Sequence, residues 1–540
     1  MSTTHSATGF LVGIAVLLAT PAARADEGAP ILPLAQVKPG MVGEARTVFA
    51  GTSPEAFKVR VVSILRNFMP RQDVILIRAE DARVEALGIA AGMSGSPVYV
   101  DGKLMGAIAY GWSFAKEPLA GVTPIESMLA EGDRPDRPPP DPPLAAAAAP
   151  VGAPSAGVED TGPAQLRPVT IPLSVSGASD TALSYLGEEL RASGLRPVRA
   201  GGSGGKAPAA AAPLVPGAAV GVALVSGDMT TTAMGTLTYS DGRRVFAFGH
   251  PMFGIGSVSL PFVQGEVHAI IPSLSSSLKM ASPVAEIGTI TDDSRSGVIG
   301  QLGVRSGTVP LQVRVTSQGV AKPPFTVEIA RHRRLLPVLA TVALSTALGE
   351  AVPDVTNMTA EVTTRLFLRG FPPLELRDYL FTNDNLAPRV LAMSHGIRAL
   401  GELSGNVFEP AVVEKIEVGV RVEYRADTAE IVALTSPGGE VLAGTRLPLR
   451  VTLRPYHGAE FVETVNVELP RALAGRTVKV EVASGAQVKP ELPRAENLRG
   501  MVENLRTYYP AASLVVSLTT ADDGIDLHGR LLRNLPPMIL

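Results

Sequence analysis

The 540-residue chain contains no cysteine and a single tryptophan. Without cysteine, the protein has no disulfide bond, no thiolate metal site and no cysteine nucleophile. Aromatic residues make up 5% of the chain and charged residues 18%, whereas glycine and proline number 54 and 46. This composition favours many short strands and turns over long helices. We therefore expect a mainly β protein.

The chain also has little excess of one sign of charge over the other. The formal net charge is -3 at pH 7, so the protein has no basic field that would attract nucleic acid, and we expect no nucleic-acid partner. No cofactor-binding or metal-ligating pattern stands out, and we expect neither a cofactor nor a metal ion. The chain is long enough to bury several cores, which predicts more than one domain.

Long apolar runs are confined to the N-terminus. Residues 9–19 are apolar and are followed by Ala-Arg-Ala at 23–25. This pattern is typical of a secretory signal cleaved after Ala25, so we expect an exported protein, periplasmic or extracellular. The run is short for a membrane span, but no Lys or Arg precedes it, which leaves an uncleaved N-terminal anchor as the alternative.

Two segments of low complexity divide the chain. One is rich in proline and alanine and the other in glycine and alanine, so neither can pack a core of its own. The predicted organisation is a signal peptide at 1–25, a β unit at 26–131, a linker at 132–166, a small strand-helix element at 167–200, a second linker at 201–215, a second β unit at 216–350 and a β-rich, β-sandwich-like accessory region at 351–540.

The run GMSGSP at 92–97 is the first candidate for chemistry. It lies directly before an apolar strand, an Asp-Gly turn and a second strand. Glycines allow a backbone that exposes a serine Oγ and turns N–H groups towards a developing oxyanion. If Ser94 is a nucleophile, the N–H groups of Gly92 and Ser94 are the natural oxyanion donors. A glycine-rich hairpin entry, with serines as turn formers, explains the same run equally well.

A serine nucleophile needs a general base, and histidine suits neutral pH. His250 begins a glycine-rich loop after a strand hairpin, where a functional group can be carried. The alternative is a loop histidine that hydrogen-bonds its own turn. Four further histidines are more simply interpreted as solvated, exposed or capping residues: His332, within a cationic run, and His395, His457 and His528.

Two separated stretches resemble one known family. The sequence GMSGSPVYVDGKLMGAIAYGW at 92–112, followed by GVTPIESML at 121–129, resembles the nucleophile region of the SpoIVB-type serine peptidases. The stretch 235–250 resembles the catalytic-histidine segment of that family, and the stretch 285–300 is also similar to the family. The resemblance implies a chymotrypsin-like double β-barrel in which Ser94 is the nucleophile and His250 the general base.

The resemblance points less directly to the acid of the triad, and the order of the serine and histidine segments differs from that of the family. The family has an acidic residue shortly before the nucleophile turn, which implies Asp81 here; a surface Glu-Asp pair is the alternative. Asp292 or Asp293 could serve instead, because such triads are recognised by geometry. In the family the histidine segment comes first, whereas here Ser94 precedes His250, so the two halves of the barrel pair are expected in permuted order. No PDZ-like module is evident.

The sequence thus predicts a secreted serine endopeptidase that acts on polypeptides. Self-processing is a further expectation, since the linker at 132–166 offers a cleavage site. The alternative is a catalytically inactive envelope scaffold on a peptidase-like fold, with the C-terminal region binding a partner protein. An α/β-hydrolase esterase is disfavoured because the motif lacks the second glycine of Gly-x-Ser-x-Gly and no helix pattern follows it.

Overall fold

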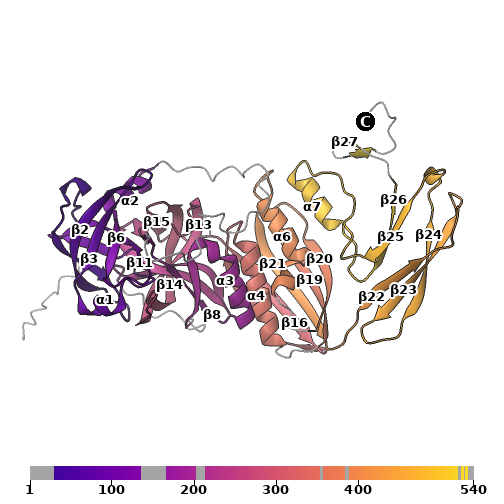
Figure 1. The fold of residues 1–540 in the computed structure, drawn as a ribbon, viewed down its shortest axis with the longest axis horizontal. Helices are drawn as coiled ribbons and strands as arrows, with labels where there is room; N and C mark the ends of the chain where they lie inside the picture. The colour runs from indigo at the N-terminus through magenta and orange to yellow at the C-terminus, as the bar shows by residue number, and fades with distance from the viewer. Residues whose placement is uncertain are drawn as a thin grey trace, which may run out of the picture.

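The computed structural model describes residues 29–134, 166–201, 213–352, 357–383, 388–520, 525–527 and 530–532. The expected signal peptide at 1–25 and most of both expected linkers lie outside these residues, as does His528. The expected mainly β fold is confirmed: strands dominate every region, from the N-terminal unit to the C-terminal one (Figure 1). No helix in the described part of the chain is long and apolar enough to cross a membrane.

The N-terminal unit is a closed antiparallel barrel of six strands. The strands follow the order β4-β1-β2-β3-β6-β5, and the pairing of β4 with β5 closes the ring. Apolar side chains such as Phe57, Ile75 and Ile108 fill its interior, since alternate residues of a strand face inward. The elements are β1 (Val42–Thr47), β2 (Glu55–Met69), β3 (Gln72–Ala79), α1 (Ala82–Leu87), β4 (Pro97–Val100), β5 (Lys103–Gly111), β6 (Leu119–Pro124) and α2 (Ile125–Gly132).

A second ring of six strands follows in the chain. Its order is β10-β13-β14-β15-β12-β11, closed by the pairing of β10 with β11. The two rings together give the double barrel that the resemblance implied. Before the second ring, β7 (Arg167–Pro168) adds to β5 of the first barrel, and β8 (Ile171–Ser176) adds to β11. The ring consists of β10 (Ala219–Gly227), β11 (Thr230–Ser240), β12 (Arg244–Ala247), β13 (Gly256–Ile271), β14 (Leu278–Ser294) and β15 (Gly297–Leu302).

The sheet of the second ring continues beyond it. From β10 the order runs β18-β16-β21-β19-β20, and β16 pairs in parallel with β21. The expected domain border at 350 lies within α4 (Leu336–Ala351), an apolar helix that packs against this sheet. The other elements are α3 (Asp180–Glu189), β9 (Leu195–Arg199), β16 (Thr308–Ser317), β17 (Val320–Ala321), β18 (Phe325–Ala330), β19 (Met358–Leu368), β20 (Leu374–Thr382), α5 (Pro388–Ala392), α6 (His395–Gly405) and β21 (Val413–Glu423).

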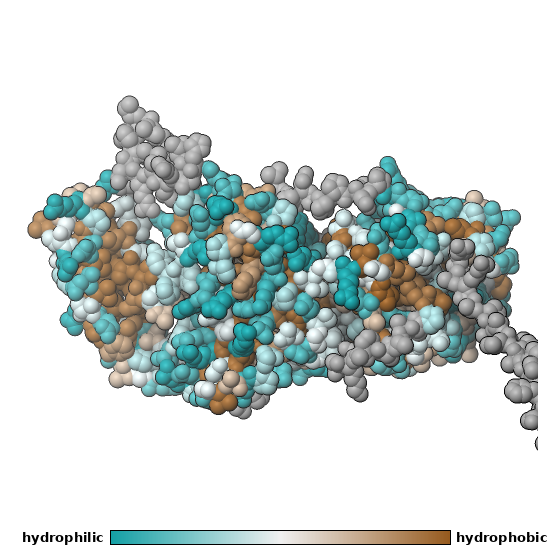
Figure 2. Space-filling view, turned by 180° about the vertical axis from the view of Figure 1, so that it is seen from behind, coloured by the Kyte–Doolittle hydropathy of each residue, from teal (hydrophilic) through white to brown (hydrophobic). Residues whose placement is uncertain are grey.

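Small separate sheets make up the described C-terminal region. Three strands, β22 to β24, form one sheet, and β25 pairs with β26 in another. Apolar side chains that include Phe461 and Val462 remain partly exposed here, and brown surface gathers over this end of the molecule in Figure 2. The elements are β22 (Ala429–Thr435), β23 (Arg446–Pro455), β24 (Phe461–Glu468), β25 (Lys479–Ser484), α7 (Leu498–Arg506), β26 (Leu514–Thr519), β27 (Ile525–Leu527) and β28 (Arg530–Leu532).

Candidate active site

In the nucleophile turn, residues 92–96, three N–H groups form hydrogen bonds within the described part of the chain and two do not. The N–H groups of Met93, Gly95 and Ser96 donate to carbonyl oxygens at 3.0, 2.7 and 3.0 Å. Among the described residues, the N–H groups of Gly92 and Ser94 have no hydrogen-bond partner. Gly92 and Gly95 have φ values of 91° and 92°, in the left-handed region that glycine adopts at no steric cost. The glycines thus allow the backbone in which two N–H groups are left unused.

Strand β11 of the second barrel holds this turn of the first barrel. Thr236 N donates to the Ser94 carbonyl at 2.9 Å, and Thr236 Oγ1 donates to the Gly92 carbonyl at 3.1 Å. Thr238 Oγ1 donates to the Gly95 carbonyl at 2.8 Å. A Cβ atom on Gly95 would lie only 2.0 Å from the Thr236 carbonyl oxygen. The orientation of the turn therefore depends on close contact between the two barrels.

The loop that carries His250 leaves β12 and packs on the first barrel. Phe248 and Gly249 both have φ values of 70°, an uncommon conformation for a bulky residue such as phenylalanine. Thr123 Oγ1, on β6, donates to the Gly249 carbonyl at 2.6 Å. A Cβ on Gly249 would lie 3.0 Å from the Ala107 side chain. Glycine at 249 thus permits the close approach that the sequence predicted.

The Ser94 and His250 segments are brought together around Thr236. Phe248 N donates to the Thr236 carbonyl at 3.3 Å, while Thr236 N donates to the Ser94 carbonyl. Ser94 is 0% exposed and His250 2%. Ser94 Oγ and His250 Nε2 are both buried without a hydrogen-bond partner in the described residues. The two segments are neighbours, but no hydrogen bond links Ser94 Oγ to the imidazole.

Burial controls the charge of His250. Removal from water lowers the pKa of His250 from 6.5 to about 4, and the carbonyls of Pro251 and Val169 oppose this shift only in part. The Pro251 carbonyl oxygen lies 2.9 Å from Nδ1. A proton on Nδ1 would donate to that oxygen and leave Nε2 with its lone pair. At neutral pH the imidazole is therefore uncharged, which is the form that can accept a proton.

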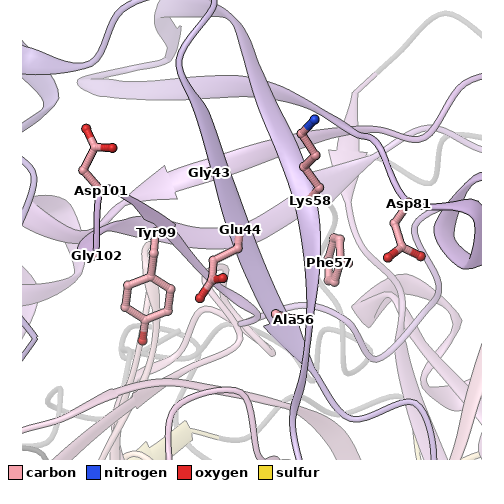
Figure 3. Close-up of a pocket in the computed structure, with 9 residues that line it drawn as sticks. All are labelled: Gly43, Glu44, Ala56, Phe57, Lys58, Asp81, Tyr99, Asp101 and Gly102. Carbon is pink, nitrogen blue, oxygen red and sulfur yellow. The ribbon is translucent and has the colours of Figure 1, made fainter.

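Asp81 is occupied elsewhere in the first barrel. It is the N-cap residue of α1, where its carboxylate accepts from Arg83 N at 3.0 Å and from Arg83 Nε at 3.1 Å. These bonds to Arg83 hold the pKa of Asp81 below its usual value. The carboxylate also lines a pocket with Glu44 and Lys58 (Figure 3). None of its hydrogen bonds in the described residues goes to His250, so its expected orienting role stays a prediction without support from these contacts.

Asp293, the alternative acid, supports the histidine loop instead. Its buried carboxylate accepts from the N–H groups of Met252, Phe253 and Gly254 at 2.8, 2.7 and 2.9 Å. Burial raises the pKa of Asp293 to about 6, although these N–H bonds favour the ionised form. Asp293 therefore fixes the backbone that directly follows His250 and Pro251.

One histidine differs from its expected setting. His332 was expected in a solvated turn, but its ring stacks on Phe253 at 6.5 Å and its Nδ1 accepts from Leu335 N at 3.3 Å. Burial, with help from Arg334 and Arg333, lowers the pKa of His332 to about 4. The expectation failed because the contact with Phe253 joins segments about eighty residues apart, which local charge does not reveal.

Sequence reasoning also missed Lys279, a buried amine beside the nucleophile turn. It is 1% exposed, and burial lowers the pKa of Lys279 to about 7. A single lysine in a strand carries no signal of burial, because most strand lysines are solvated. In the described residues, no group of three or more histidine, aspartate or glutamate side chains is placed to hold a metal ion.

Comparison with known proteins gives one match, to a family of peptidases. The family model described as SpoIVB peptidase S55 matches residues 12–129, which include the nucleophile turn but end before the His250 loop. No curated protein and no solved structure matches the chain. The family match supports a serine peptidase function and polypeptide substrates. Over residues 12–129 the chain is thus similar to the SpoIVB peptidase S55 family.

Proposed function

We propose that this protein is an exported serine endopeptidase with Ser94 as nucleophile and His250 as general base. The observation that carries the proposal is the pair of unused N–H groups at Gly92 and Ser94, on a turn held against the His250 loop. Free, preorganised N–H donors in a water-excluded site are what stabilises an acyl-transfer oxyanion. A neutral buried imidazole on the adjacent loop supplies the base.

The reaction follows from these groups. Ser94 Oγ attacks the carbonyl carbon of the scissile peptide while its proton passes to His250 Nε2. The carbonyl oxygen becomes an oxyanion that accepts from the N–H groups of Gly92 and Ser94. The C–N bond then breaks, and the imidazolium returns the proton to the leaving amine. Water hydrolyses the acyl-enzyme by the same route in reverse, with His250 again as base.

The site is closed by the chain itself, which bears on substrate access. Val169 N donates to the Ala109 carbonyl at 2.8 Å, and the backbone of Val169 is one of the groups that raise the pKa of His250 against the effect of burial. On the other side of the site, a Cβ on Gly92 would lie 3.1 Å from Pro172 Cγ. We therefore propose a latent form, covered by residues 166–172, which opens when the chain is cut in the linker that precedes this segment. This agrees with the expectation of self-directed cleavage.

The test is proteolysis by the purified chain. Wild-type protein should cut itself between 132 and 166 and then digest an unfolded polypeptide such as casein, whereas Ser94→Ala and His250→Ala should do neither. Ser96→Ala is the matched control, because Ser96 Oγ is buried in the same turn and donates to the Met93 carbonyl at 2.7 Å. Equal proteolysis by wild type and Ser94→Ala would contradict the proposal.

The second candidate is the inactive scaffold. It is favoured by the lack of a hydrogen bond between Ser94 Oγ and His250, and by the exposed apolar side chains on the C-terminal sheets that could bind a partner protein. Catalytic hydrogen bonds often form only with substrate bound, so this observation does not decide against catalysis. A wild-type chain without proteolysis, even after the linker has been cut by an added protease, would favour the scaffold.

Export is part of the proposal and has its own test. The sequence at 9–25 supports removal of a signal peptide and a periplasmic or extracellular location. N-terminal sequencing of the protein recovered from outside the cytoplasm should begin at Asp26. A chain that keeps residues 1–25 would instead support the membrane-anchored alternative.

A further inference from the structure

Lys279 lies in the contact between the two barrels. Its Nζ donates to Thr47 Oγ1 of the first barrel at 2.7 Å and lies 3.5 Å from Thr236 Oγ1 of the second. Among the described residues, no carboxylate forms an ion pair with it. An amine removed from water without a counter-charge is unfavourable, and a methionine would fill the same volume without that penalty. The position of the amine therefore needs a reason other than packing.

The second contact of the amine leads to the nucleophile turn. Thr236 Oγ1 donates to the Gly92 carbonyl at 3.1 Å. A hydroxyl has one proton to give, so a donor placed on its lone pairs favours the rotamer in which that proton points to Gly92. The aliphatic part of the lysine side chain also packs close to Gly92, because a Cβ atom added to Gly92 would lie 3.1 Å from Lys279 Cβ.

The Gly92 carbonyl is a sensitive point for catalysis. The peptide plane between Gly92 and Met93 is rigid, and it lies between the two N–H groups that the proposed function assigns to the oxyanion. A rotation of this plane would change the direction of the Gly92 and Ser94 N–H groups relative to each other. Loss of alignment in such a site reduces the rate far more than it reduces substrate binding.

We propose that Lys279 is a positioning residue for the oxyanion site: its amine orients the Thr236 hydroxyl, which in turn fixes the Gly92 carbonyl. This inference rests on the proposed peptidase function. It assigns to Lys279 no contact with substrate and no step of proton transfer.

Substitution can isolate the amine. Lys279 N donates to the Ala91 carbonyl at 2.9 Å, and Lys279→Met keeps this backbone bond and the length of the side chain. Thr236→Val removes the hydroxyl in the same shape, whereas Thr236→Ser keeps it. Thr232→Val is the matched control, since Thr232 lies on the same strand, is buried, and has a hydroxyl without a partner in the described residues.

The experiment measures kcat and KM for a chromogenic ester substrate, together with the rate of labelling by a fluorophosphonate. We expect Lys279→Met and Thr236→Val each to lower kcat about 10- to 100-fold, less than the roughly 100- to 1,000-fold loss that follows removal of an oxyanion donor itself, with KM changed less than about threefold. The double variant should lose no more than the worse single variant, because both act on one carbonyl. Thr236→Ser and Thr232→Val should keep nearly full kcat.

Two results would overturn the inference. One is a Lys279→Met protein with wild-type kcat; the other is a loss of kcat that Thr232→Val shares. If Lys279→Met does not fold, the Thr236 pair decides, since equal rates for Thr236→Val and Thr236→Ser contradict the role of the hydroxyl. All variants are compared after the linker has been cut by an added protease; a cut wild-type chain that neither turns over nor labels would refute the peptidase function itself, and this inference with it.

Discussion

At the residue scale, the environment of His250 links its chemistry to acid stability. Its pKa is about 4 in the folded protein, below the ordinary value of 6.5. The unfolded chain therefore binds more protons than the folded one as the pH falls below 6.5, so this residue lowers the stability of the fold progressively down to about pH 4. Above pH 6.5 the imidazole is neutral in both states and contributes no such dependence.

His250→Gln should remove this pH dependence. Between pH 7 and pH 4 the wild-type protein should lose about 3 kcal/mol more free energy of unfolding than the variant, because a pKa shift of one unit corresponds to about 1.4 kcal/mol. Urea unfolding of both proteins at the two pH values measures the difference. Parallel losses in the two proteins would show that the imidazole is not buried as described.

The two candidate acids can be separated by paired substitutions. Asp81→Asn retains a good N-cap residue for α1, and its effect on fluorophosphonate labelling should stay below about threefold. Asp293→Asn loses one of the two oxygens that hold the Met252, Phe253 and Gly254 N–H groups, so labelling should fall by at least about tenfold as the loop loosens. Loss of labelling in Asp81→Asn alone would establish Asp81 as the orienting acid.

At the element scale, the contact between β11 and the nucleophile turn depends on Gly95. Gly95→Ala would place a Cβ 2.0 Å from the Thr236 carbonyl oxygen, at a φ of +92°. We expect a loss of about 2–4 kcal/mol in stability together with loss of labelling, because backbone atoms must move. Gly102→Ala is the control, since it also has positive φ but no atom within 4 Å of its Cβ. Equal losses in both would assign the effect to φ alone.

The sequence predicted the elements whose cause is local. Glycines at 92, 95 and 249 indicated tight turns and close approach, and β-branched runs indicated strands, both of which the structure confirms. Long-range pairings could not be predicted in this way. The parallel pairing of β16 with β21, across the expected border at 350, depends on which strands meet in space. The same holds for Lys279 and Asp293, whose partners are distant in the sequence.

At the scale of the whole molecule, the order of the two barrels in the chain does not prevent their contact. The turn at 92–96 comes before the His250 loop in the chain. Two threonines of β11, Thr236 and Thr238, nevertheless donate hydrogen bonds to the carbonyls of that turn. Ahead of the second barrel in the chain, β7 pairs with β5 of the first barrel. The geometry of the site is thus set by contacts between barrels and not by the linker.

Cutting the linker should therefore leave the molecule assembled. With a site for a specific protease inserted between 140 and 160, the cut chain should elute as one species in size-exclusion chromatography, because the barrels stay joined by hydrogen bonds and buried apolar contacts. If residues 166–172 cover the active site as proposed, the cut should also increase the rate of fluorophosphonate labelling. Separation of the two fragments would contradict this account of the barrel contact.

The proposed catalysis depends on Ser94 as a nucleophile that His250 activates. The most direct measurement is to label the purified chain with a fluorophosphonate and to locate the adduct by mass spectrometry. We expect a single adduct on Ser94, absent from Ser94→Ala, reduced by orders of magnitude in His250→Ala and retained in Ser96→Ala. An adduct on another serine, or undiminished labelling of Ser94→Ala, would contradict it.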